Sequence, residues 1–71
     1  MNYEIELKLK ELLKERKMTQ VELSKISGVR QSTISDIIRG SRTVINFEHL
    51  SKISKALNLK AIDEIIDFKN K

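Results

Sequence analysis

The 71-residue chain has no cysteine, proline or tryptophan, and it has only two glycines, one histidine, one tyrosine and two phenylalanines. The lack of cysteine excludes disulfides and thiolate metal sites, and one histidine cannot build a zinc site by itself. So few aromatic side chains do not supply the stacking platforms of a single-strand-binding protein. Because so short a chain leaves little room for an enclosed active site, we expect no enzyme, no cofactor and no metal.

Long apolar runs are also missing from the sequence. No stretch approaches the ~18 apolar residues of a membrane span, and the first ten residues, "MNYEIELKLK", are too charged for a signal peptide. We therefore expect a cytoplasmic protein with no membrane partner. Fourteen Lys and Arg against ten Asp and Glu give a net charge of +4, which weakly favours an acidic partner such as nucleic acid.

Apolar residues recur at helical spacing along most of the chain, which predicts an all-α fold of five short helices. Four of the expected helices run from about Tyr3 to Lys17, Gln20 to Ser27, Gln31 to Arg39 and Ile62 to Phe68, and the fourth in chain order follows an N-cap at Asn46. The fourth helix is expected to turn Phe47, Leu50, Ile53 and Leu57 inward. Residues 1–71 are expected to form a single domain in which only residues 69–71 are frayed.

Capping residues mark the ends of the central helices. Thr19 and Glu22 have the spacing of a capping box, in which each side chain accepts from the other residue's backbone N–H. Gly28 and Gly40 follow the second and third helices, where a left-handed residue permits a sharp stop. Asn46 is the expected N-cap of the fourth helix.

The third helix separates two kinds of side chain by spacing. Its expected buried side is formed by Ile34, Ile37 and Ile38. Its expected exposed side is formed by Gln31, Ser32, Ser35, Asp36 and Arg39. Since Gln and Ser both donate and accept hydrogen bonds, this face suits the reading of base edges in a major groove.

The stretch from Gln20 to Arg39, "QVELSKISGVRQSTISDIIR", resembles the helix-turn-helix of the phage-repressor and Cro family, also called the XRE family. The matching positions at the family's spacing are Gln20, Ser24, Gly28, Ile34 and Ile37. The resemblance implies a compact five-helix domain of the lambda-repressor-like type, with the helix-turn-helix at residues 20–39 in its centre.

The resemblance also implies how the protein contacts DNA, with the third helix in the major groove. The implied base-reading residues are Gln31, Ser32, Ser35, Asp36 and Arg30. The implied phosphate contacts are Gln20, Arg39, Ser41, Arg42 and Thr43. Arg30 stands where family members commonly have a Ser or Thr cap, so we expect it to give up helix stability for a DNA contact.

The function implied by the family is that of a sequence-specific double-stranded DNA-binding transcriptional regulator, a repressor acting as a homodimer on a palindromic operator. The expected dimer interface includes Ile62, Ile65 and Phe68, and no small-molecule ligand is implied. The alternative is a protein-interaction module, such as an antitoxin or an anti-repressor partner, on the same scaffold. An interaction module predicts more apolar anchors on the third helix than Gln, Ser and Asp.

Two positions depart from the family pattern. Family members often pair an arginine on the first helix with a glutamate late in the third, but the matching residues here are Leu13 and Ile38. We expect an apolar contact between them, which avoids the desolvation of two charges. Lys60 and Ala61 stand where many members place a Ser or Thr cap, so the start of the fifth helix is the least defined element.

Overall fold

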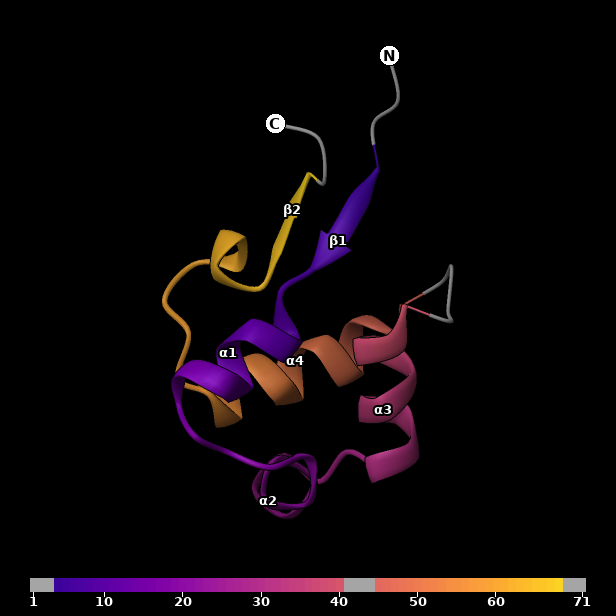
Figure 1. Cartoon of the computed structure of the whole chain (residues 1–71), viewed down its shortest axis with the longest axis vertical. Helices are drawn as coiled ribbons and strands as arrows, with labels where there is room; N and C mark the ends of the chain where they lie inside the picture. The colour runs from indigo at the N-terminus through magenta and orange to yellow at the C-terminus, as the bar shows by residue number, and fades with distance from the viewer. Residues whose placement is uncertain (1–3, 41–44, 69–71) are drawn as a thin grey trace.

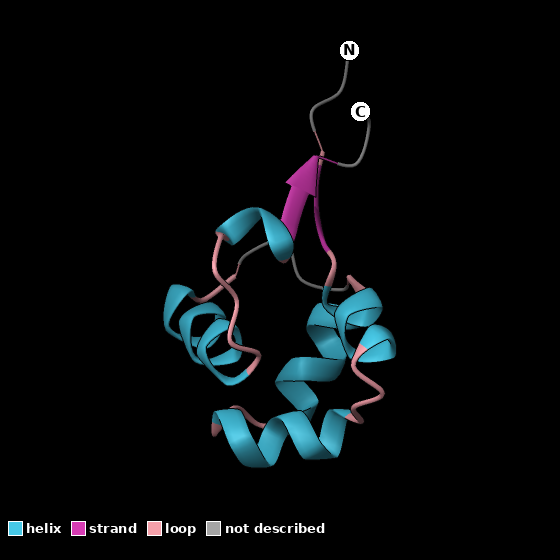
Figure 2. Ribbon diagram, turned by 90° about the vertical axis from the view of Figure 1, so that its left-hand side faces the viewer, coloured by secondary structure: helices cyan, strands magenta, loops and turns pink. Residues whose placement is uncertain are grey.

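The computed structural model describes residues 4–40 and 45–68. Four α-helices, one 3₁₀ helix and a two-stranded sheet occur among the described residues. In chain order they are β1 (Ile5–Leu7), α1 (Leu9–Glu15), α2 (Gln20–Ser27), α3 (Gln31–Arg39), α4 (Phe47–Ala56), η1 (Ile62–Glu64) and β2 (Ile66–Phe68). The four α-helices pack together, and the sheet projects from them at one end of the molecule (Figures 1 and 2).

The three central helices form where the sequence predicts them. Helices α2 and α3 have the expected bounds, and α4 begins directly after Asn46. The Asn46 side chain accepts from the backbone N–H groups of Glu48 and His49 at 2.7 and 3.3 Å. Short-range caps define the starts of α2 and α4, and left-handed glycines define the ends of α2 and α3.

The all-α, five-helix prediction is wrong at the two ends of the described chain. Helix α1 begins at Leu9 rather than at Tyr3, which lies outside the described residues, and the predicted fifth helix is η1 followed by β2. Strands β1 and β2 are antiparallel, with Ile5 opposite Phe68, Glu6 opposite Asp67 and Leu7 opposite Ile66. Both segments alternate apolar and acidic residues, the period of a strand with one apolar face.

The sheet has one apolar and one charged face, because directly opposed residues share a face. Leu7 and Ile66 are half-buried and pack against the helical core, whereas Glu6 and Asp67 belong to the other face. Lys8 extends the ladder by donating its backbone N–H to the Ile65 carbonyl at 2.7 Å, and its ammonium lies 3.6 Å from Asp67. The sheet therefore covers one end of the core with its apolar side.

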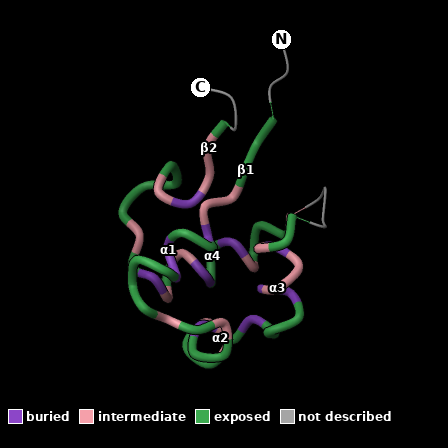
Figure 3. The backbone as a smooth tube through the Cα atoms, in the orientation of Figure 1, coloured by how far each residue is buried: buried purple, intermediate pink, exposed green. Residues whose placement is uncertain are grey.

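The core lies between the helices and reaches the base of the sheet (Figure 3). Its buried apolar residues are Leu9, Leu12, Leu13, Leu23, Val29, Ile34, Ile37, Leu50, Ile53, Leu57 and Ile65. Leu13 belongs to this cluster and Ile38 packs against it, so two aliphatic residues of one core stand where family members often have an ion pair. The inward placement of Phe47 is wrong, because its side chain is 80% exposed at the first residue of α4.

Two polar contacts fasten the turns around the core. The Arg16 guanidinium, just after α1, donates to the carbonyl of Leu57, the C-cap residue of α4. The Glu64 carboxylate accepts from the backbone N–H groups of Lys60 and Ala61 at 2.6 and 2.8 Å. Glu64 thus supplies from within η1 the acceptor that Ala61 cannot provide, and these bonds to the backbone of Ala61 and Lys60 lower the pKa of Glu64.

Candidate nucleic-acid interface

The capping box at the start of α2 fixes where the helix-turn-helix begins. Thr19 Oγ1 accepts from the Glu22 backbone N–H at 3.1 Å, and Glu22 Oε1 accepts from the Thr19 backbone N–H at 2.9 Å. Hydrogen bonding by Thr19, through its backbone first and its side chain second, lowers the pKa of Glu22. The first turn of α2, which carries Gln20, is therefore held by two reciprocal bonds.

The turn between α2 and α3 is fixed by glycine geometry and by two serines. Gly28 adopts φ +77°, a left-handed conformation that strains other residues. Ser24 Oγ donates to the Val29 carbonyl at 2.7 Å, and Ser27 Oγ accepts from the Val29 N–H at 3.1 Å. Val29 itself is buried in the core, so the residue before the N-cap of α3 is held by packing and by hydrogen bonds. This fixes the direction in which α3 leaves α2.

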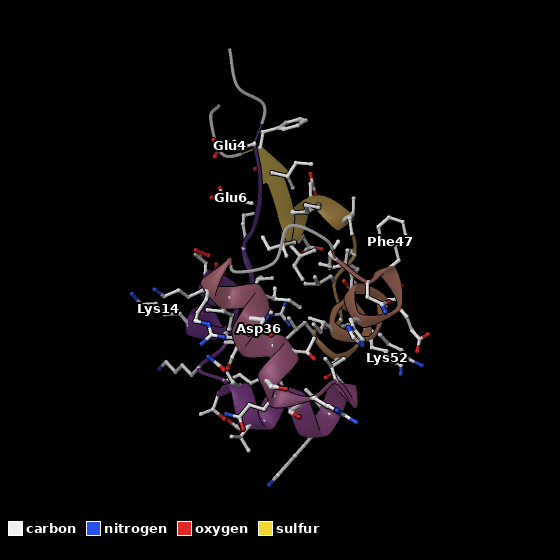
Figure 4. The ribbon with its side chains drawn as sticks, turned by 90° about the vertical axis from the view of Figure 1, so that its right-hand side faces the viewer. Glu4, Glu6, Lys14, Asp36, Phe47 and Lys52 are labelled. Atoms are coloured by element: carbon white, nitrogen blue, oxygen red, sulfur yellow. The ribbon has the colours of Figure 1, made fainter. Side chains whose placement is uncertain are left out.

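Helix α3 buries one face and exposes a polar one. Thr33, Ile34 and Ile37 are buried, and Ile38 is half-buried against the core. The outer residues are Arg30, Gln31, Ser32 and Arg39, which are exposed, and Ser35 and Asp36, which are half-buried. The structure thus brings all of the expected base-reading residues to the α3 segment, and Figure 4 shows Asp36 on the face of α3 turned to the viewer. Thr33 was not among the residues expected to be buried.

Arg30 occupies the N-cap position of α3 without making a side-chain cap. Its backbone has φ −59° and ψ 142°, and its side chain makes no capping hydrogen bond. The first turn of α3 also contains no acidic residue. The backbone N–H groups of this turn are therefore not capped by the residue in front of them, and an exposed cation stands beside them.

Asp36 and Arg39 form an ion pair one turn apart on α3. The guanidinium Nη2 and the carboxylate Oδ1 are 2.5 Å apart, and the Arg39 side chain is 67% exposed. An exposed pair of this kind contributes only about 0–1 kcal/mol, so exchanging Asp36 for a phosphate as the partner of Arg39 costs little. The pair also offsets part of the negative charge that Asp36 brings to this face.

Gln20 and Ser35 connect the start of α2 to the middle of α3. Ser35 Oγ donates to Gln20 Oε1 at 2.5 Å, across a junction that is partly buried. Gln20 was expected as a phosphate contact and Ser35 as a base contact, and the structure places the two side chains in direct contact. Spacing along the sequence gives no indication of this bond, because it joins two helices at an angle set by the turn.

The remaining predicted site residues divide into two groups. Ser41, Arg42 and Thr43 lie outside the described residues, directly after Gly40 ends α3 with φ +67°. Of the expected dimer residues, Ile62 and Phe68 are 58% and 51% exposed. Ile65 is 1% exposed and belongs to the core, so it contributes no surface to an interface in this conformation.

Sequence reasoning also missed the exposure of Ile5. Ile5 falls within the first helix predicted from the sequence, but it is 65% exposed and lies opposite Phe68 in the sheet. The alternation in "EIELKL" is the signal that would have found it. Ile5 and Phe68 therefore form an exposed apolar pair at the outer end of the sheet.

The described residues contain no group of three or more His, Cys, Asp and Glu placed to hold a metal ion. None of the helices in residues 4–40 and 45–68 is both long and apolar enough to cross a membrane.

Helix α2, the turn at Gly28 and helix α3 with its polar outer face have the arrangement of a helix-turn-helix, the motif of a class of DNA-binding proteins. Comparison with protein-family models agrees with this geometry: the helix-turn-helix family model matches residues 9–65. The chain belongs to this family, of the XRE type, and is a DNA-binding transcription regulator. No curated protein and no solved structure gives a significant match to the chain.

Proposed function

We propose that the protein is a sequence-specific transcriptional repressor that binds a palindromic operator in double-stranded DNA as a homodimer. The observation that carries this proposal is the outer face of α3, where polar side chains are presented by a helix whose other face is buried. Among the described residues, none of the large exposed hydrophobic side chains lies on α3. This composition favours base edges over a protein partner, whose docking requires apolar or aromatic anchors.

The proposed base-reading residues are those at the outer face of α3 and its N-cap. Gln31 and Ser32 belong to the first turn, the end of the helix that enters the groove in this family. Gln31 suits a bidentate bond to adenine N6 and N7, and Asp36 suits acceptance from cytosine N4. Arg30, exposed before the first turn, reaches a phosphate or a base edge.

The proposed phosphate contacts lie on both sides of the reading helix. Gln20 and the N-terminal N–H groups of α2 supply donors at one side. Arg39, with Ser41, Arg42 and Thr43 beyond it, supplies them at the other. Each phosphate neutralised by a Lys or Arg steepens the fall of log affinity with log salt by ~0.9.

The proposed dimer forms at the outer end of the sheet. Ile5 and Phe68 are exposed there as a cross-strand pair, and Ile62 is exposed on the neighbouring η1. A two-stranded sheet is marginal by itself, so covering its apolar end with the same surface of a second copy stabilises both. To read successive major grooves, the two reading helices of such a dimer must lie about 34 Å apart, one turn of DNA.

Selection of bound duplexes from a random pool, followed by a salt titration of the selected duplex, tests DNA recognition. We expect a palindromic consensus and an affinity that falls steeply with salt. Equal binding to all duplexes would refute the proposal.

Sedimentation of the purified protein tests the dimer. Phe68→Ser is expected to shift the protein from dimer towards monomer. Ile26→Ser is the matched control, since Ile26 is 56% exposed on α2, which lies at the end of the molecule opposite the sheet (Figure 1). An unchanged dimer in Phe68→Ser would contradict this interface.

A further inference from the structure

The hydrogen bond between Ser35 and Gln20 determines what Ser35 can offer to DNA. Ser35 lies in the middle of α3, and its hydroxyl donates to Gln20 Oε1 at 2.5 Å. Both side chains are half-buried, so the bond is partly shielded from water. The contact joins the first residue of α2 to the outer face of the reading helix.

Ser35 and Gln20 differ in the donors and acceptors that their mutual hydrogen bond leaves available for DNA. A serine hydroxyl has one proton and two lone pairs, so a hydroxyl that donates to Gln20 presents only acceptor sites elsewhere. The Gln20 amide accepts through its oxygen and keeps two N–H donors. The same bond therefore makes Ser35 an acceptor and turns the free end of Gln20 into a donor that suits phosphate.

We propose that Ser35 is an acceptor-only specificity determinant and that Gln20 is the positioning residue that makes it so. In the major groove the donors are the exocyclic amines of adenine N6 and cytosine N4, whereas guanine and thymine present acceptors at the corresponding place. Ser35 therefore selects adenine or cytosine on the strand it contacts. This inference rests on the proposed function, because it assigns one base preference within the proposed operator.

Asp36, the residue after Ser35, also presents hydrogen-bond acceptors. Asp36 is paired with Arg39, and an ionised carboxylate has only acceptors. Ser35 and Asp36 thus give this part of the reading face acceptors alone, while Gln31 in the first turn offers both donor and acceptor. A half-site read by this helix places exocyclic amines under Ser35 and Asp36.

Two substitutions of Gln20 distinguish its effect on the Ser35 hydroxyl from its own contribution to the affinity for DNA. Gln20→Met removes the acceptor, so the Ser35 hydroxyl becomes free to donate. Gln20→Glu keeps an acceptor for Ser35 but removes both donors and adds a negative charge that opposes phosphate. Both variants are compared with wild type and Ser35→Ala, after thermal unfolding has shown that each is folded.

The measurement is the affinity for the selected operator and for every single base-pair change in it. Wild type is expected to favour adenine or cytosine over guanine or thymine by about fivefold or more at one half-site position. Ser35→Ala and Gln20→Met should bring that ratio close to one. Gln20→Glu should bind all these duplexes more weakly and retain the ratio.

The outcomes distinguish this inference from the proposed function. If wild type selects an operator but Gln20→Met keeps the adenine or cytosine preference, or Gln20→Glu loses it, the role of Gln20 is refuted. If Ser35→Ala leaves every base preference unchanged, Ser35 is not a reader. If wild type selects no sequence, the proposed function itself fails and this inference fails with it.

Discussion

The helix-turn-helix and the terminal sheet differ in the distance along the chain over which their contacts act. In residues 19–29, the Thr19–Glu22 capping box and the bonds of Ser24 and Ser27 to Val29 join residues two to five positions apart. In the sheet, Ile5 pairs with Phe68, at the opposite end of the described chain. Local contacts define the start of α2 and the turn into α3, whereas the sheet depends on the helices to bring its two strands together.

The largest expected difference between the two regions is in the free energy of unfolding lost when an apolar side chain is shortened. Leu23→Ala, which empties a 0% exposed site in α2, should lower the free energy of unfolding by about 2–5 kcal/mol. Ile5→Ala in β1 removes a side chain that is 65% exposed and should cost less than about 1 kcal/mol in the monomer. Urea unfolding at low protein concentration measures both, and equal losses would contradict the burial pattern.

Loss of the cap tests the local contacts of the helix-turn-helix. Thr19→Ala removes the acceptor for the Glu22 N–H and should destabilise the protein by about 0.5–2 kcal/mol. Thr19→Ser keeps the hydroxyl and is the matched control, which should unfold close to wild type. A Thr19→Ala variant as stable as wild type would show that α2 begins correctly without its capping box.

Replacement of Arg30 should stabilise the protein, in contrast to the loss of the Thr19 cap. Arg30→Ser introduces a cap at α3 that is worth about 1 kcal/mol and removes a cation from the positive end of the helix. We expect a higher melting temperature together with weaker operator binding. Unchanged binding would mean that Arg30 is an exposed residue without a DNA contact.

Acid unfolding compares Glu22 of α2 with Glu64 of η1, the 3₁₀ helix before β2, and should show the smallest changes in stability. The pKa values of Glu22 and Glu64 are both lowered from 4.5 by hydrogen bonds from backbone N–H groups. A lowered pKa in the folded state adds stability above the unfolded value, and that stability is lost as pH falls below about 4.5 towards the folded value.

The variants Glu22→Gln and Glu64→Gln should therefore lose less stability than wild type between about pH 5 and pH 3. Denaturant midpoints measured across this range provide the test, with Glu48→Gln as a control on an exposed ion pair of α4. A pH dependence as steep as that of wild type in both variants would mean that neither carboxylate contributes.

The central helices could be predicted from sequence because most of their ends are defined by capping residues close to them in the chain. The capping box, the left-handed glycines and the Asn46 cap all act within a few residues, and each is present in the structure. The polar face of α3 follows from helical periodicity alone.

The terminal elements could not be predicted from helical periodicity because two periods fit the same residues. In "EIELKL" the apolar residues Ile5 and Leu9 match a helix, but Ile5, Leu7 and Leu9 also alternate as in a strand. Which period wins depends on whether Ile66–Phe68 is nearby, and that is decided by packing. The bond from Ser35 to Gln20 is missed for the same reason, since it requires the angle between α2 and α3.

Pairing between β1 and β2 also imposes an order on events during protein synthesis. The ribosome completes Ile5–Leu7 some sixty residues before Ile66–Phe68, so β1 has no partner strand until α2, α3 and α4 have been made. The helical contacts are closer in sequence and can form first, because closing a shorter loop costs less entropy. The DNA-reading helices are therefore expected to be in place before the sheet closes.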